Sequence, residues 1–174
     1  MNIRTATEDD LPSIARTHEA AFGHADEASL VRALLADPSA RPWLSLVVED
    51  SGEIVGHVLF TAVSATGSPA AILAPLAVMP DRHRGGIGSA LVEDGLRRLR
   101  QSDTGLVFVF GDPAYYRRFG FEAAAPHGLD APYPIQPEFA DAWMVAALRD
   151  GLLGKVIGRV RCADTLSRPE LWQV

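Results

Sequence analysis

A glycine-rich junction between an apolar run and an amphipathic run constrains this chain most. Residues 70–78 form an apolar run typical of a buried strand, and residues 79–85 form a short loop. From Gly86 to about Arg100, apolar side chains recur at helical spacing, which predicts a helix. Glycines let the backbone approach a ligand closely, and the first amides of a helix have no partner within the helix. A strand, a glycine loop and a helix start therefore indicate a site for phosphate or pyrophosphate.

The same junction has a plainer interpretation as a tight turn with close packing of helix on sheet. Two known phosphate loops fit it poorly. A Walker A loop needs Lys and then Ser or Thr after its last glycine, whereas Gly88 is followed by Ser89-Ala90. A dinucleotide-binding loop follows the first strand and has an acidic residue about 20 residues later. Here the glycines lie in mid-chain, and Asp103 begins a loop.

The residues around this junction resemble the acyl-CoA-binding motif of the GNAT superfamily of N-acetyltransferases. The resemblance lies in Leu76-Ala77-Val78-Met79-Pro80 and, after a short loop, Gly86-Ile87-Gly88-Ser89-Ala90-Leu91. The family motif reads Gln/Arg-x-x-Gly-x-Gly/Ala, and His83 stands where Gln or Arg is usual, beside Arg84. The resemblance implies that acetyl-CoA is the acyl donor and that it binds at Leu76, Ala77, Val78, His83, Arg84, Gly85, Gly86, Ile87, Gly88 and Ser89.

A second segment, residues 111–121, resembles another GNAT motif and an uncharacterised bacterial subgroup of these enzymes. Its sequence is Gly-Asp-Pro-Ala-Tyr-Tyr-Arg-Arg-Phe-Gly-Phe. The resemblance implies that Asp112 and Tyr115 belong to the acetyl-CoA site, and that Tyr116 donates to the leaving CoA thiolate. These residues also have a purely structural interpretation. Asp112-Pro113 is a good helix start, and Tyr116 could be a half-buried aromatic residue that anchors a short helix.

The resemblance also implies the fold class, α/β (α+β). We expect a mixed, mostly antiparallel sheet that is splayed between its fourth and fifth strands and flanked by helices. Residues 106–110 are expected to lie parallel to the strand ending at Val78, through a right-handed crossover. The edge exposed by the splay could pair with the pantetheine amides, through the backbone of Leu76 and Val78. Apolar and turn patterns predict helices at 11–22 and 26–36 and further strands at 3–6, 43–49, 54–63, 143–148 and 155–162, with a turn at 66–69.

The general base is the least determined part of the site. A lysine-like amine costs about 4.6 kcal/mol to deprotonate at pH 7, whereas an α-amino group costs about 1 kcal/mol. Residues 70–78 contain no carboxylate, so His57 is the best candidate, acting through a water molecule. The alternative is an inward polar residue that bonds to the backbone. The resemblance implies that His18 and His24 could touch the substrate, since in that family this helical pair borders the amine site; otherwise His18 is a polar helix edge and His24 a loop residue.

Two further features bear on the mechanism. Cys162 is the sole cysteine, and its place in an expected strand favours a small core residue over an acyl carrier, so we expect direct transfer from CoA to amine. Residues 123–137 are rich in proline and could form a lid or wall over the acceptor, or merely a surface connection.

Composition sets outer limits on function. The 174 residues suit a single acyltransferase domain, 1–174. A net charge of −6 argues against nucleic acid as a partner. The start lacks the apolar core of a signal peptide and no run approaches the ~18 residues of a membrane span, so we expect a cytoplasmic protein without a membrane partner.

These observations converge on an enzyme that needs no metal, because backbone N–H groups can polarise the carbonyl. We expect an N-acetyltransferase, monomeric or homodimeric, whose acceptor is a primary amine of a small molecule or peptide. The alternative is a non-catalytic acyl-CoA-binding sensor or interaction module.

Overall fold

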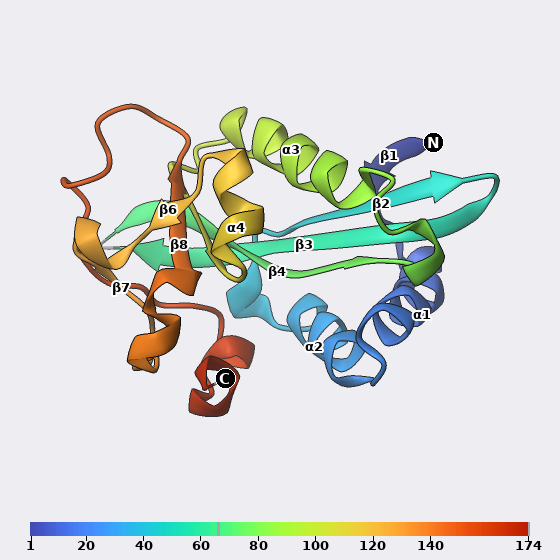
Figure 1. Ribbon diagram of the computed structural model, residues 1–174, viewed down its shortest axis with the longest axis horizontal. Helices are drawn as coiled ribbons and strands as arrows, with labels where there is room; N and C mark the ends of the chain where they lie inside the picture. Colours follow the sequence, from blue (N-terminus) through green and yellow to red (C-terminus); the bar gives the residue numbers. More distant parts are fainter. Residues whose placement is uncertain (66, 174) are drawn as a thin grey trace.

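A seven-stranded sheet forms the centre of the protein, with strands in the order β1-β2-β3-β4-β5-β8-β6 (Figure 1). The structure is a computed structural model and describes residues 1–65 and 67–173. The strands of this sheet are β1 (Asn2–Thr5), β2 (Leu44–Asp50), β3 (Glu53–Ala65), β4 (Ser68–Val78), β5 (Leu106–Phe110), β6 (Glu122–Ala123) and β8 (Trp143–Ala147). A separate parallel pair consists of β7 (Leu129–Asp130) and β9 (Gly158–Arg159).

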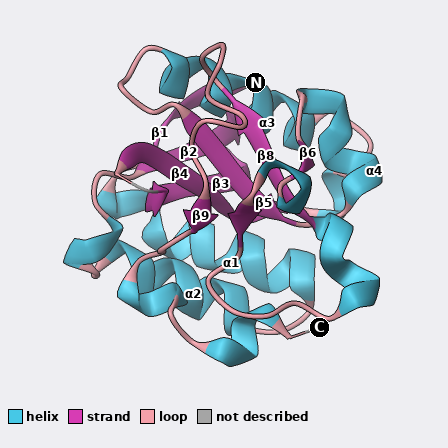
Figure 2. Cartoon of the chain, turned by 90° about the vertical axis from the view of Figure 1, so that its left-hand side faces the viewer, coloured by secondary structure: helices cyan, strands magenta, loops and turns pink. Residues whose placement is uncertain are grey.

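Helices cover both faces of the sheet (Figure 2). The α-helices are α1 (Leu11–Phe22), α2 (Asp26–Leu35), α3 (Ile87–Arg100) and α4 (Pro113–Tyr116). Short 3-10 turns span Glu8–Asp10, Pro38–Ala40, Pro80–Arg82, Arg117–Phe119, Ala125–His127, Pro137–Ala142, Asp164–Leu166 and Pro169–Trp172. Figure 1 shows α3 on one side of the long strands and α1 and α2 on the other. Each side buries its own apolar cluster, as expected for an element that is apolar on two faces.

The predicted fold class is confirmed, and the pairing of β4 shows how the splay arises. Among the described strands of the seven-stranded sheet, neighbours are antiparallel except β4 and β5, which are parallel. Their pairing covers only Ala70–Leu73 against Leu106–Val109. Against β3, the register shifts between Val58 and Phe60, which face Leu76 and Leu73. Because β4 carries an extra residue there, its last part turns away from β5 and leaves an unpaired edge.

The C-terminal third departs most from the sequence-based expectations. The strand predicted at 143–148 is confirmed as β8, but the strand predicted at 155–162 is wrong, since only Gly158–Arg159 pairs as a named strand there. Gly154 and Gly158 have φ values of 90° and 122°, which interrupt an extended backbone. Of the turn predicted at 66–69, Thr66 lies outside the described residues, and Gly67 has a φ of 80°. Within the described residues, no helix combines the length and apolarity that a membrane crossing demands.

Candidate active site

The open edge of β4 and the start of α3 enclose a first cavity of about 560 Å³. Its described lining includes every acetyl-CoA residue predicted from the junction except Gly85, together with Tyr115. The full lining is Ala21, Phe22, Leu76, Ala77, Val78, Arg82, His83, Arg84, Gly86, Ile87, Gly88, Ser89, Tyr115 and Arg118. The structure therefore brings the two predicted motifs, around residues 76–89 and 112–116, to one place.

Strand pairing fixes which backbone groups of β4 face this cavity. The N–H of Met79 donates to the carbonyl of Val55, and Val78 lies opposite Gly56. Hydrogen-bonding direction alternates along an antiparallel pair, so Ala77 turns its backbone toward β3 while Leu76 and Val78 turn theirs away. The ring of His83 bonds to the outward carbonyl of Val78 at 2.9 Å. By the same alternation, the N–H of Leu76 points away from β3, toward the open edge of β4 beside the cavity.

The first turn of α3 presents backbone rather than side chains. Gly86 precedes the helix with a φ of 79°, a left-handed value that suits glycine. At Gly88, a Cβ would lie 2.8 Å from the hydroxyl oxygen of Tyr115, so only glycine leaves that ring its place. Ile87 is buried in the core, and its contribution here is limited to its backbone. The bare N-terminus of a fourteen-residue helix can hold an anion.

Positive charge surrounds that helix start. Arg118 lies over the ring of Tyr115 at 4.6 Å and donates to the hydroxyl of Ser89 at 3.2 Å. Arg84 has a φ of 67°, unusual for a residue with a side chain. Arg82 is held in an ion pair with Asp50 at 2.7 Å. The arginines at 84 and 118 add charge to a site that the helix N-terminus already makes favourable for an anion.

A short helix, α4, fixes the two tyrosines. The carboxylate of Asp112 accepts from the N–H of Ala114 at 3.0 Å, so the helix-start role of Asp112 is confirmed. The ring of Tyr116 lies against Gly111, where a Cβ would be 2.5 Å from Cε2, and meets Phe121 edge to face. Burial raises the pKa of Tyr116, followed by the charges of Tyr115 and Asp112. Its phenol therefore stays protonated at neutral pH and can donate.

A second cavity of about 580 Å³ adjoins the first and shares Phe22, Leu76 and Tyr115 with it. Its described lining comes from α1 and α2, the diverging strands, α4 and the C-terminal segment. The residues are Phe22, Glu27, Leu30, Ile72, Leu73, Ala74, Pro75, Leu76, Val109, Phe110, Gly111, Asp112, Tyr115, Tyr116, Leu166, Leu171 and Trp172. Tyr116 lines the second cavity and meets the shared residue Tyr115 edge to face, with ring centroids 4.9 Å apart. It therefore stands beside the junction of the two cavities, where a group could pass from one ligand to another.

The structure places His57 in the core instead. Its side chain is fully buried, with Nδ1 2.8 Å from Nε2 of His18 and Nε2 2.9 Å from the hydroxyl of Ser45. Burial lowers the pKa of His57 to about 3, and the charge of His18 adds to this. His57 is not among the described residues that line either cavity. The predicted base therefore lies apart from the described lining of both cavities.

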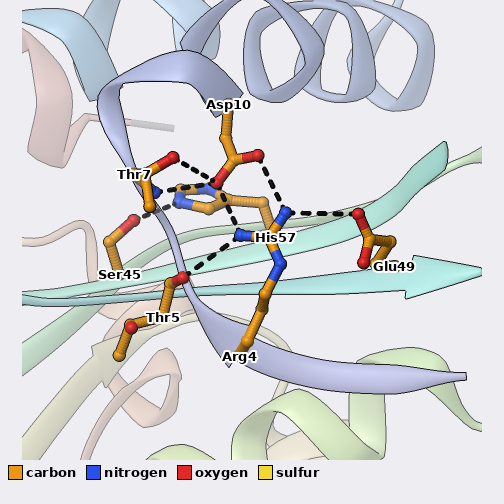
Figure 3. A network of polar contacts seen from close by, with 7 residues as sticks. All are labelled: Arg4, Thr5, Thr7, Asp10, Ser45, Glu49 and His57. Atoms are coloured by element: carbon orange, nitrogen blue, oxygen red, sulfur yellow. Dashed lines mark hydrogen bonds and ion pairs between the residues drawn. The ribbon is translucent and has the colours of Figure 1, made fainter. Parts of the chain in front are cut away.

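His18 corrects a second expectation, since it is fully buried rather than a polar helix edge. Burial lowers its pKa to about 4. Figure 3 shows the polar cluster beside this pair, in which Arg4 bonds to both carboxylate oxygens of Asp10, at 2.7 and 2.9 Å. The ion pair between Arg4 and Asp10 ties β1 to the start of α1, and Arg4 lowers the pKa of Asp10 to about 2. His24 is an exposed loop residue.

Cys162 packs partly buried against the core, and burial raises the pKa of its thiol to about 12. A thiol so rarely ionised is a poor nucleophile. The proline-rich residues 123–137 are also absent from the described lining of both cavities, which favours a connection over a lid. Among the described residues, no group of three or more His, Cys, Asp or Glu side chains is arranged to hold a metal.

Sequence reasoning missed part of the second cavity. Phe22 ends α1, is 39% exposed and lines both cavities, a role that its place on the apolar face of the helix did not reveal. The wall formed by Trp172 could not be expected, because it depends on the C-terminal segment folding back to stack on Phe110 at 5.8 Å. Glu27 supplies a carboxylate from α2, whereas the sequence analysis sought one on the strand at 70–78.

The match to a family model decides the classification. Residues 2–124 match the model described as an acetyltransferase (GNAT) domain. The chain belongs to the GNAT family. The resemblance inferred from the two motifs is confirmed, and the chain is an acyltransferase of this family.

This chain matches relatives and solved GNAT structures over most of its length and most of theirs. The uncharacterised N-acetyltransferase YjhQ of Escherichia coli K12 is 43% identical over 160 residues, 89% of this chain and 88% of the relative. The crystal structure of YhbS from E. coli with CoA has a TM-score of 0.86 at 34% identity, covering 96% of this chain and 92% of that one. A GNAT acetyltransferase from Brucella melitensis with acetyl-CoA has a TM-score of 0.74 at 29% identity, covering 94% and 96%.

Proposed function

We propose that this protein transfers an acetyl group from acetyl-CoA to a primary amine, directly, while both are bound. The carrying observation is the meeting of two cavities at Phe22, Leu76 and Tyr115, with Tyr116 beside the junction. The first cavity suits acetyl-CoA, and the second, largely apolar cavity suits the acceptor. GNAT relatives whose crystals contain CoA or acetyl-CoA support the donor.

The residues of the first cavity fit the donor chemically. Bare amides at Gly86 and Gly88, with Arg84 and Arg118 nearby, suit the pyrophosphate. The outward backbone of Leu76 and Val78 suits the amides of the pantetheine arm, which would add to β4 like a short strand. The N–H of Leu76 is then placed to polarise the thioester carbonyl. Because His83 already bonds to the Val78 carbonyl, its ring must turn away if pantetheine takes that oxygen.

The transfer needs a neutral amine and a stabilised thiolate. The amine nitrogen attacks the thioester carbon, the C–N bond forms, the C–S bond breaks, and the proton lost by nitrogen ends on the CoA sulfur. The pKa of a phenol is ordinarily above that of a thiol, and burial raises the pKa of Tyr116 further. We therefore assign Tyr116 to donate a hydrogen bond to the leaving sulfur, with the final proton coming from the amine.

The test is thiol release from acetyl-CoA with a panel of primary amines. We expect turnover that depends on amine, and a loss of roughly 10²-fold in kcat for Tyr116→Phe, since a positioned donor contributes on this scale. Tyr133→Phe is a matched control, because Tyr133 lines a different hollow. Unchanged kcat in Tyr116→Phe would remove Tyr116 from the mechanism. Binding of acetyl-CoA without turnover of any amine would instead support a sensor.

A further inference from the structure

The second cavity holds two charged side chains among its described lining, Glu27 and Asp112. Asp112 is already engaged, because its Oδ1 caps α4. Apolar groups from Leu30, Leu73 and Trp172 make up much of the rest. Glu27 is therefore the charge that such a cavity offers to a ligand.

The carboxylate of Glu27 is poorly satisfied by the protein itself. Its Oε2 atom is buried and accepts no hydrogen bond from the described residues. The nearest basic atom is Nδ1 of His24, at 3.3 Å. That nitrogen accepts from the N–H of Asp26 at 3.4 Å, which requires a lone pair, so the neutral ring cannot also donate from it to Glu27. The Glu27 side chain is 26% exposed, and its ion-pair contact among the described residues is to His24, which is charged only when protonated. The carboxylate is therefore available to a cationic ligand in the cavity.

Shared lining shows where Glu27 stands along the cavity. Phe22, Leu76 and Tyr115 mark the end that meets the acetyl-CoA cavity. Glu27, Leu30 and Leu171 also line a neighbouring hollow between α2 and the C-terminal segment, and so mark the other end. Glu27 is thus away from the position of the attacking nitrogen.

We propose that Glu27 determines acceptor specificity by binding a second cationic group of the acceptor. This inference rests on the proposed function and deepens it. The acceptor is then an amine that carries another ammonium or guanidinium several bonds from the reacting nitrogen. A carboxylate beside the reacting nitrogen itself would stabilise its charged form and oppose attack, whereas at the far end it orients the molecule and leaves the reacting amine neutral.

The experiment compares linear diamines of three to six methylenes with monoamines of equal length, at saturating acetyl-CoA. All ratios of kcat/KM are corrected for the lower microscopic pKa of each amine group in the diamine, where the second charge repels the first. We expect the corrected ratio to favour the best diamine by about tenfold or more, beyond the factor of two for its two reactive ends, as a charge-assisted hydrogen bond allows. In Glu27→Gln the ratio of diamine to monoamine should fall to near two. Glu19→Gln is the matched control, since Glu19 is exposed on α1 and lines a different hollow.

The outcomes separate this inference from the proposed function. If Glu27 is instead the proton acceptor, Glu27→Gln lowers kcat/KM for the diamine and the monoamine equally and leaves their ratio unchanged. That result overturns the inference. A ratio near two in the unaltered protein overturns it as well, while amine-dependent turnover still supports the proposed function. If no amine is acetylated, calorimetry with CoA-saturated protein decides: 1,4-diaminobutane should bind, and Glu27→Gln should abolish that binding. Absence of binding to the unaltered protein, or equal binding by the variant, counts against the inference.

Discussion

Acidification should destabilise this fold well above the pH at which carboxylates titrate. His18 and His57 are buried as neutral rings, and their pKa values fall to about 4 and about 3, from an ordinary 6.5. Asp10, held by Arg4, favours the charged form of His57 but does not offset its burial. Because these pKa values are lowered in the folded state, the unfolded chain binds more protons than the folded chain between the folded and unfolded pKa values. The stability is therefore complete above pH 6.5 and is lost as pH falls below it.

The size of the loss follows from linkage. Each histidine contributes about 1.4 kcal/mol per pH unit once the pH is well below its unfolded pKa. Between about pH 7.5 and pH 5 this amounts to about 2 kcal/mol per ring, or about 4 kcal/mol for the pair. The sum requires only that both folded pKa values lie below 5, so it does not depend on how the shift is divided between them. It is a large part of the 5–15 kcal/mol typical of a domain.

Urea unfolding followed by tryptophan fluorescence measures this directly, because Trp143 and Trp172 are buried. The free energy of unfolding should fall by about 4 kcal/mol over that pH range. His57→Gln should lose about half of the pH dependence, whatever its stability at neutral pH. His24→Gln, an exposed control, should keep it. A free energy that is flat from pH 7.5 to pH 5, or a full slope in His57→Gln, would refute the reasoning.

Three other substitutions test the packing and the site. Gly88→Ala pushes a Cβ to 2.8 Å from the hydroxyl of Tyr115 and should raise the KM for acetyl-CoA by about tenfold, measured by initial rates, with kcat less affected. Asp37→Ala removes the acceptor of bonds from the N–H and hydroxyl of Thr165 at 2.9 and 2.7 Å; it should cost about 1–3 kcal/mol in urea unfolding. The unaltered protein and Cys162→Ser should both give intersecting double-reciprocal plots, because burial raises the pKa of the Cys162 thiol to about 12 and makes it a poor nucleophile. Parallel lines in the unaltered protein that become intersecting in Cys162→Ser would indicate a covalent route through Cys162.

The first two thirds of the fold could be predicted because local signals and topology agree there. Glycine-rich turns separate the apolar runs of β2 to β5, and one glycine junction fixes the start of α3. Much of the first cavity was predictable for the same reason, since most of its lining lies between Leu76 and Ser89, whereas Ala21, Phe22 and Arg118 come from distant segments. Backbone groups are expected to make many of the contacts to acetyl-CoA, and their direction depends on strand register more than on side-chain identity.

The remaining features depend on contacts between distant segments. Residues 155–162 are apolar enough for a strand, yet Gly158 within the segment and Gly154 just before it have positive φ values that interrupt it, and most of the segment is exposed or half-buried. The burial of His57 depends on His18, which lies 39 positions earlier, and no single-segment pattern shows that two polar rings satisfy each other. Trp172 lines the second cavity because the C-terminal segment folds back, where Trp172 stacks on Phe110 and Thr165 bonds to Asp37.

The missing strand carboxylate and the buried His57 lead to the same conclusion about the acceptor. If no group of the protein removes a proton at the junction of the cavities, the amine must arrive neutral, and rate should rise with pH until the amine is fully deprotonated. The first pKa of a diamine is lower than that of a matched monoamine, because the second charge repels the first. A diamine can therefore bind Glu27 through one ammonium group, while its other ammonium group loses a proton more easily than that of a monoamine. The pH profile of kcat/KM should follow the amine from one substrate to the next, and a profile fixed by the enzyme would contradict this account.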